Sequence, residues 1–229
     1  MSKSSLRNQQ NLALIKARLA SKGIGGAKTT QGIKRVSNAT DCPLSSAQMR
    51  VWLSEKMFPG TASYNLTNAY EIKGELDQTN LEQAVRVTIG QHRVLNIVLS
   101  ENQHGEPRQS YSPTQRIDFV RHNVTHLAIE EATTEAYRLA RENAETPFNI
   151  HSDSLIRATL FEIAERHCIL VFTAHHLVFD GGSFSIFVQS LMANYVNISN
   201  DHKLADENDS PDFLDFSHWE NEPTQQQRL

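Results

Sequence analysis

Two apolar stretches, separated by only four residues, constrain the fold of this 229-residue chain more than any other feature. Residues 154–163 read SLIRATLFEI and residues 168–176 read CILVFTAHH. A connection this short joins neighbouring antiparallel strands, so we expect a hairpin. The second stretch is apolar at odd and even positions alike, which is typical of a central strand covered on both faces.

Helical periodicity surrounds this hairpin in the sequence and sets the fold class. We expect four helices and a short final one, with Ser45 or Ser46 capping the first and Asn80 capping the second. We also expect three more strands and a polar turn at residues 101–109. Together these elements predict an α/β protein, a two-layer sandwich of a mixed, largely antiparallel sheet with helices. The expected helices are residues 47–58, 81–89, 126–143, 183–197 and 213–223, and the expected further strands are residues 65–74, 94–100 and 116–124.

Charge is divided unevenly along the chain. Residues 1–40 contain eight Lys and Arg and no Asp or Glu, so the overall charge of -4 leaves -12 for residues 41–229. The division predicts a basic leader over 1–40, with one helix near Asn11–Ser21, attached to an acidic domain over 41–229. Three interpretations of the leader stay open: a solvated linker, a contact for an acidic partner, or a transit peptide.

Composition also bears on the compartment. No apolar run approaches the 18 residues of a membrane span, and the amino-terminal residues contain no long apolar core of a secretion signal. Cys42 and Cys168 are far apart in sequence and are interpreted as reduced, unpaired thiols. We therefore expect a cytoplasmic protein whose partners include neither a membrane nor a nucleic acid.

The step from the second apolar strand to the next helix reads TAHHLVFDGGSF and carries the candidate site. Adjacent strand residues point to opposite faces, so His175 and His176 cannot serve the same small site. We expect one histidine to face a cavity and the other to pack inside. Gly181 and Gly182 let the backbone come close to a ligand, and their amide groups suit an oxyanion or carbonyl oxygen.

Asp180, the acidic residue between His176 and the next helix, is expected to pair with a basic residue elsewhere in the chain. A buried carboxylate needs a counter-charge, and Arg157 lies centrally in the preceding apolar strand, so we expect an Asp180–Arg157 ion pair with a structural role. Ser183 is interpreted as the N-cap of the following helix rather than the nucleophile of a Gly-x-Ser-x-Gly elbow, because the fifth position is Ser185. A metal site is not favoured, because the two histidines diverge and no fourth ligand is near.

The stretch from His175 to Gly181 resembles the HHxxxDG signature of the condensation domains of nonribosomal peptide synthetases. The resemblance implies the fold of chloramphenicol acetyltransferase. It also implies that this chain is the amino-terminal one of two similar lobes, which enclose the active site in a tunnel between them. Similar segments run from about residue 43 to the end: PLSSAQMRVWLSEKM at 43–57, YNLTNAYEIKGELDQTNLEQAV at 64–85, FNIHSDSLIRATLFEI at 148–163 and FLDFSHWENE at 213–222.

Two features bear on the subtype. The family's second motif usually reads R-H-E-x-L-R-T, whereas residues 91–97 read QHRVLNI, so three signature charges differ and the usual local ion pairing is in doubt. Heterocyclisation relatives replace the histidine pair, so its presence argues against that subtype. Epimerisation relatives keep the motif, and the opening PLSSAQMRVW favours condensation.

The resemblance implies an acyltransferase that forms an amide bond between a donor acyl or peptidyl thioester and an acceptor aminoacyl thioester. Both substrates are tethered to carrier proteins by phosphopantetheine, and no metal or diffusible cofactor is bound. His176 is the expected catalytic residue, and the isolated lobe is expected to be inactive without the carboxy-terminal lobe. The alternative is a non-catalytic module that docks a carrier protein or the acidic tail of an upstream subunit. The expected supporting residues are His175, Asp180, Gly181, Gly182 and Arg157.

Overall fold

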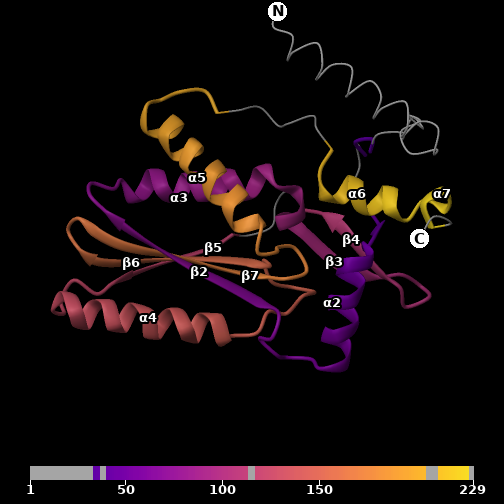
Figure 1. Cartoon of the computed structure of the whole chain (residues 1–229), viewed down its shortest axis with the longest axis horizontal. Helices are drawn as coiled ribbons and strands as arrows, with labels where there is room; N and C mark the ends of the chain where they lie inside the picture. Colours follow the sequence, from indigo (N-terminus) through magenta and orange to yellow (C-terminus); the bar gives the residue numbers. More distant parts are fainter. Residues whose placement is uncertain (1–32, 37–39, 113–116, 205–210, 227–229) are drawn as a thin grey trace, which may run out of the picture. The chain divides into compact units, whose positions relative to one another are not determined.

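The structure is a computed structural model that describes residues 33–36, 40–112, 117–204 and 211–226 (Figure 1). Apart from Ile33, these residues belong to the compact unit Lys34–Leu229. The helix expected near Asn11–Ser21, and most of the basic leader, lie outside the described residues.

A four-stranded sheet forms the centre of the unit, and its strand order is β2-β7-β6-β5. β7 pairs antiparallel with both β2 and β6, whereas β5 pairs parallel with β6. The expected hairpin is therefore confirmed, and the sheet is mixed. Its strands are β2 (Asn65–Lys73), β5 (Asp118–Asn123), β6 (Ile156–Ala164) and β7 (His167–His175).

A smaller sheet of order β1-β4-β3 contains β1 (Cys42–Pro43), β3 (Ile97–Glu101) and β4 (Pro107–Tyr111). The strand expected from residue 94 begins only at Ile97, because the chain first makes the 3₁₀ turn η1 (Arg93–Asn96). The buried Asn96 amide donates to the Ile89 carbonyl at 2.7 Å and favours this turn. Strand periodicity does not reveal a hydrogen bond between residues seven apart, so the turn could not be predicted from it.

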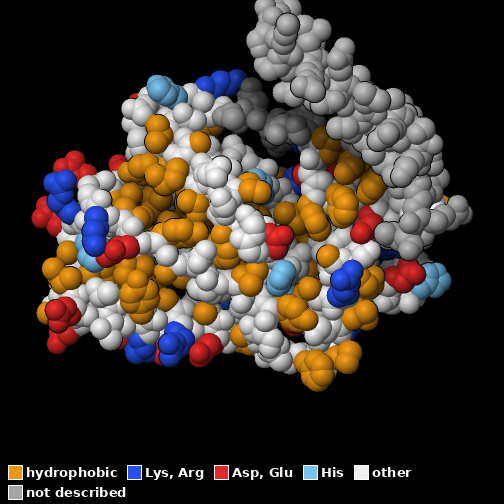
Figure 2. All heavy atoms as spheres, viewed as in Figure 1, with side chains coloured by type: hydrophobic (Ala, Val, Ile, Leu, Met, Phe, Trp, Pro, Cys, Tyr) orange, Lys and Arg blue, Asp and Glu red, His pale blue; other side chains and the backbone are white. Residues whose placement is uncertain are grey.

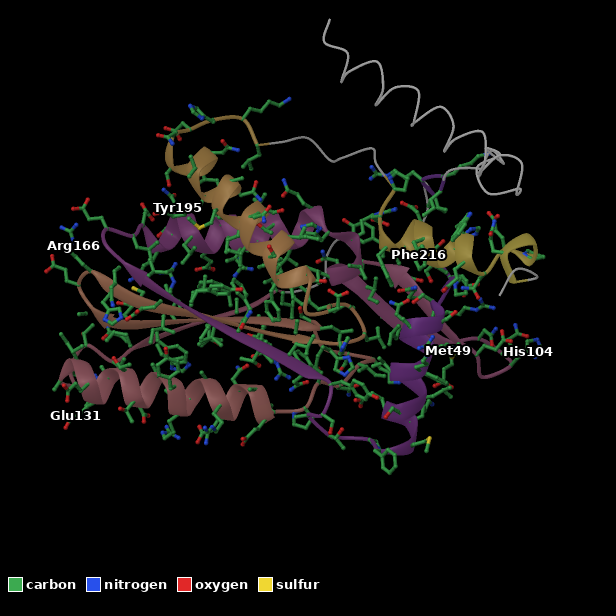
Figure 3. All side chains as sticks on the ribbon, in the orientation of Figure 1. Met49, His104, Glu131, Arg166, Tyr195 and Phe216 are labelled. Atoms are coloured by element: carbon green, nitrogen blue, oxygen red, sulfur yellow. The ribbon has the colours of Figure 1, made fainter. Side chains whose placement is uncertain are left out.

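Helices cover both faces of the larger sheet (Figure 1). The even positions of β7 belong to the hydrophobic cluster that includes residues of α3 and α5, and Ile169 and Val171 belong to the cluster that includes residues of α4. Figure 3 accordingly shows Tyr195 of α5 and Glu131 of α4 on opposite sides of the sheet. The α/β class and the mixed sheet are confirmed, while the helices on both faces add a layer to the two that were expected. The helices concerned are α3 (Gln78–Gln91), α4 (Ile129–Glu145) and α5 (Ser183–Ser199).

The N-caps of α2 and α3 can be compared with the caps expected from the sequence. α2 (Ser46–Met57) begins after Ser45, whose hydroxyl accepts from the Gln48 amide while the Gln48 side chain accepts from the Ser45 amide. This capping box confirms the expected start. The cap of α3 is Asp77 rather than Asn80, because the Asp77 carboxylate accepts from the amides two and three residues later. The expectation failed there because Asn80 is itself an acceptable cap.

The helix α6 (Phe213–Glu220), which is followed by α7 (Pro223–Gln226), packs beside β1 and η1. Arg93 of η1 contacts the carboxylates of both Asp212 and Asp215, the second at 2.8 Å. The Asp215 side chain is fully buried, and that of Arg93 is 11% exposed. Position 93, where the family's motif usually has an acid, thus carries a base that pairs with acids about 120 residues later.

Three further features concern the cysteines, the helices and the exposed hydrophobic side chains. Cys42 and Cys168 are free thiols, and both are buried. No helix among the described residues is long and apolar enough to cross a membrane. Hydrophobic side chains gather at the lower end of α2 in Figure 2, where Met57 and Phe58 are 69% and 61% exposed.

Candidate active site

The two neighbouring histidines have opposite environments. His175 is the last residue of β7 and is 1% exposed, whereas His176 is the first residue of the following turn and is exposed. Backbone hydrogen bonds fix both residues: the His175 amide donates to Leu155 and the His176 amide donates to Tyr64. The expected separation of the pair is therefore observed, with His176 on the open side.

His176 lines a cavity of about 270 Å³ at the end of the central sheet. The walls come from five parts of the chain: α2, η1, the turn after β7, the start of α5 and the start of α6. Gln48 of α2 helps to hold the turn, because its buried side-chain amide donates to the Leu177 carbonyl at 3.2 Å. The cavity therefore depends on elements far apart in sequence.

His175 is a packing residue with a defined tautomer. Its Nδ1 accepts from the Leu177 amide at 3.3 Å, so the proton resides on Nε2, which lies 3.4 Å from Oε1 of Glu55. Burial, assisted by the neighbouring His176, lowers the pKa of His175 to about 4. Burial raises the pKa of Glu55. The His175 ring is therefore neutral near pH 7, and it also packs edge-on against Phe148.

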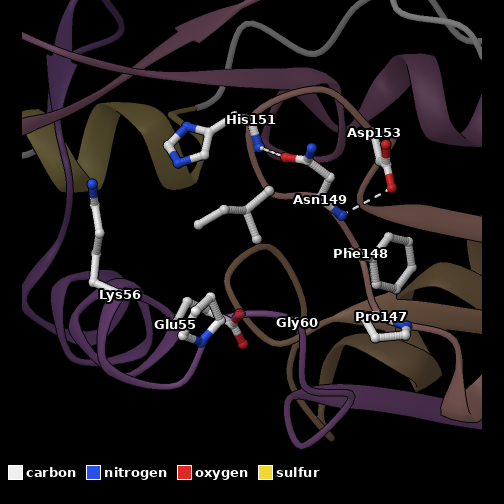
Figure 4. A pocket seen from close by; sticks show the side chains of 10 residues that line it. Glu55, Lys56, Gly60, Pro147, Phe148, Asn149, His151 and Asp153 are labelled. Carbon is white, nitrogen blue, oxygen red and sulfur yellow. Dashed lines mark hydrogen bonds between the residues drawn. The ribbon is translucent and has the colours of Figure 1, made fainter.

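Glu55 was not expected from the sequence. It is 7% exposed and lines a cavity of about 640 Å³ between the end of α2 and the loop after α4 (Figure 4). The loop is shaped by two hydrogen bonds, from the Asn149 amide to Asp153 and from the His151 amide to Asn149. The available signal was helical spacing, because Gln48, Trp52 and Glu55 form the buried face of α2.

Asp180 does not form the expected ion pair with Arg157. Its carboxylate accepts from the Ser183 amide at 2.8 Å and from the Ser183 hydroxyl at 2.7 Å. These two hydrogen bonds, together with the nearby Gly182 backbone and His176, lower the pKa of Asp180. Ser183 is the first residue of α5 and Gly182 is its N-cap, so the side chain that satisfies the helix start belongs to Asp180, not to Ser183.

Arg157 lies on the opposite face of the sheet. Its guanidinium donates to the carbonyls of Thr146 and Pro147, both at 2.9 Å, and stacks 3.7 Å from the centre of the Phe148 ring. Odd-numbered residues of β6 face α4, and Arg157 is one of them. Asp180 precedes α5, which covers the other face. The sequence alone does not show that Arg157 and α5 lie on opposite faces of the sheet, and the expected ion pair failed for this reason.

The backbones of Gly181 and Gly182, the two glycines of the turn, have different surroundings. The Gly182 backbone lies close enough to the Asp180 carboxylate to help lower its pKa, whereas among the described residues no hydrogen bond engages the Gly181 amide. A side chain placed at Gly181 would meet no atom within 4 Å. Both glycines are exposed, so the backbone here stays open to a ligand. Within the same described part of the chain, no three His, Cys, Asp or Glu side chains form a group that could hold a metal ion.

Comparison with known proteins places this chain in a family. Residues 38–229 match the family model of the condensation domain. The chain is 34% identical over 175 residues to a linear gramicidin synthase protein of Brevibacillus parabrevis, covering 75% of this chain and 3% of that protein. It is 29% identical over 187 residues to surfactin synthase subunit 2 of Bacillus subtilis (strain 168), covering 82% of this chain and 5% of that protein. The chain belongs to the condensation-domain family.

Solved structures show the same fold. The starter condensation domain of rhizomide synthetase RzmA matches with a TM-score of 0.70 at 22% identity, over 79% of this chain and 43% of that one. The first condensation domain of the calcium-dependent antibiotic synthetase, in complex with a substrate analogue, matches with a TM-score of 0.68 at 24% identity. That match covers 72% of this chain and 40% of the other. The chain thus spans about two fifths of these domains and a few per cent of the curated relatives.

Proposed function

We propose that this chain forms part of a condensation domain that joins a donor acyl or peptidyl thioester to an acceptor aminoacyl thioester, with His176 as the catalytic residue. One observation carries the proposal. His176 is exposed and lines a cavity at the end of a buried strand, while its neighbour His175 is buried and hydrogen-bonded. A packing role therefore accounts for one histidine of the motif and not for the other.

The chemistry needs an imidazole in this position. The acceptor amine attacks the donor carbonyl carbon, a C–N bond forms, and the C–S bond of the donor thioester breaks. His176 accepts the amine proton or orients the amine through a hydrogen bond, and the proton leaves with the departing thiol. The Gly181 amide is the donor that we assign to the developing oxyanion, since Gly182 faces the Asp180 carboxylate whereas the space around Gly181 is open.

Substrates and partners follow from the same proposal. Carrier proteins deliver both thioesters on phosphopantetheine, so the domain itself binds no diffusible cofactor. The remaining part of the condensation domain supplies the other wall of the reaction chamber. We therefore expect the 229-residue chain alone to form no amide bond from two loaded carrier proteins.

The test uses a complete condensation domain that contains this chain and two loaded carrier proteins. His176→Ala should lower the rate of amide formation by roughly a hundredfold or more, the scale expected for a positioned acid–base group. His104→Ala is the matched control, because His104 is exposed on the turn between β3 and β4 and lies outside the cavity. Full activity of the His176→Ala enzyme would contradict the proposed role.

A further inference from the structure

A second, smaller cavity of about 130 Å³ adjoins the one lined by His176. The two cavities share four lining residues, from η1, the turn after β7 and the start of α5. The smaller one, which we name the side cavity, therefore opens beside the proposed reaction centre. The shared residues are Val94, Val178, Phe179 and Ser183.

The described walls of the side cavity are mostly apolar and carry no charged side chain. Its remaining residues are His92, Leu95, Ile186 and Phe187. Burial lowers the pKa of His92, so this ring is neutral near pH 7. The Ser183 hydroxyl is already hydrogen-bonded to Asp180. Among the residues that the structure describes, no Asp, Glu, Lys or Arg side chain lines the side cavity, so these walls offer no counter-charge to a charged ligand group.

The side cavity is built from packed residues rather than from a loose surface. Phe187, Leu95 and Phe179 are 2%, 3% and 5% exposed. The rings of Phe179 and Phe187 pack edge-on with centres 6.0 Å apart, which fixes one side of the wall. Ile186 is different, because it is 61% exposed and forms part of the mouth. A preformed apolar hollow with an exposed apolar rim is the usual character of a ligand subsite.

Size decides which ligand group fits. A cavity on the order of 150 Å³, lined by Leu, Ile and Phe, can bind benzene. A volume of about 130 Å³ therefore suits a branched aliphatic side chain. A methyl group would leave most of the side cavity empty.

We propose that the side cavity receives an aliphatic side chain of an aminoacyl substrate whose reacting group lies at His176, and so selects leucyl-like over alanyl substrates. The inference rests on the proposed function of the His176 cavity. It adds a substrate class, namely aminoacyl groups with an aliphatic side chain. Each methylene accommodated in an apolar pocket changes the ratio of kcat/KM between two substrates by roughly 10- to 200-fold.

The experiment compares two variants on α5 in a complete condensation domain that contains this chain. Ile186→Asp puts a charge at the mouth of the side cavity, and Met192→Asp puts the same charge on the same helix outside the lining of both cavities. The two native side chains are similarly exposed, at 61% and 54%. Amide formation is measured with leucyl and alanyl thioesters, varied first as donor and then as acceptor.

Ile186→Asp should lower the leucyl-to-alanyl ratio of kcat/KM by about tenfold or more on one of the two substrate sides, and Met192→Asp should leave both ratios unchanged. Unchanged ratios on both sides, in an enzyme that forms amides, would overturn the inference. A native enzyme that forms no amide would instead overturn the proposed function. His92→Ala provides a second variant: it widens the side cavity and should raise the rate for phenylalanyl relative to leucyl thioesters, and an unchanged ratio there also counts against it.

Discussion

At the scale of single residues, Arg157 joins a central strand to the end of a helix. Two hydrogen bonds to the carbonyls of Thr146 and Pro147 and the stack on Phe148 are lost together when the guanidinium is removed. We expect Arg157→Ala to lower the free energy of unfolding by about 2–4 kcal/mol. Asp180→Ala removes only an exposed capping interaction and should cost about 1 kcal/mol.

Urea denaturation of the two variants and of His176→Ala measures this ranking. His176 is exposed, so His176→Ala should change the free energy of unfolding least of the three. If Asp180→Ala proved as costly as Arg157→Ala, the purely local capping role described for Asp180 would be wrong.

The histidine pair and the arginine show where sequence reasoning at this scale succeeds and fails. The division of His175 and His176 between inside and outside follows from strand alternation, which is a local rule. The partner of Arg157 depends on which sheet face it occupies and on where α4 ends, and both are set by tertiary packing. Glu55 was missed for the same reason, since its contact with His175 spans 120 residues.

At the scale of elements, α2 and β7 meet through Glu55 and His175, and this junction should be sensitive to acid. The pKa of His175 is about 4 in the folded chain, against about 6.5 in an unfolded one. Between these pH values the unfolded chain binds more protons, so stability is retained above pH 6.5 and lost progressively towards pH 4. The loss should approach about 3 kcal/mol.

Denaturation of the native chain and of His175→Gln at pH 7 and pH 4.5 isolates this effect. The glutamine can still donate to Glu55 but does not titrate, so its free energy of unfolding should fall less on acidification. The raised pKa of Glu55 acts in the opposite direction in both proteins and largely cancels in the difference. Equal losses in the two proteins would show that His175 titrates normally.

Helices and strands themselves could be predicted wherever periodicity is strong. Leu81, Ala84, Val85 and Ile89 form the buried face of α3, as expected. Two details could not be predicted: the cap of α3 at Asp77 and the 3₁₀ turn before β3. Each depends on one polar side chain that could hydrogen-bond to any of several backbone groups nearby.

At the scale of the whole molecule, the uneven charge remains the feature that points to a partner. Residues 1–40 carry eight basic and no acidic side chains. We expect them to bind an acidic peptide, such as the tail of an upstream subunit, weakly and with marked salt dependence, because exposed charges are screened over about 8 Å at physiological ionic strength. Titration of the chain with an acidic peptide at low and high salt measures this. Salt-independent binding, or none at low salt, would contradict it.

The overall architecture could be predicted only as a class. The central hairpin and the alternation of helices and strands indicate an α/β protein with a mixed sheet, and the motif indicates where its site lies. The meeting of α2, η1, α5 and α6 around His176 involves segments from residue 47 to residue 213, and no local pattern encodes such an arrangement.

The helix α6 returns to the beginning of the unit and limits how far the chain can be shortened. Its residues hold the first strand and the start of α2: Ser217 donates to Pro43, and the Ser46 amide donates to Glu220. A version cut before Asp212 would leave the Arg93 guanidinium, 11% exposed, without either of its carboxylates. Val36 also hydrogen-bonds to Arg93 and Asp215, and Asn221 donates to Leu44. Excised pieces of this domain should therefore retain residues 36–221 as one block.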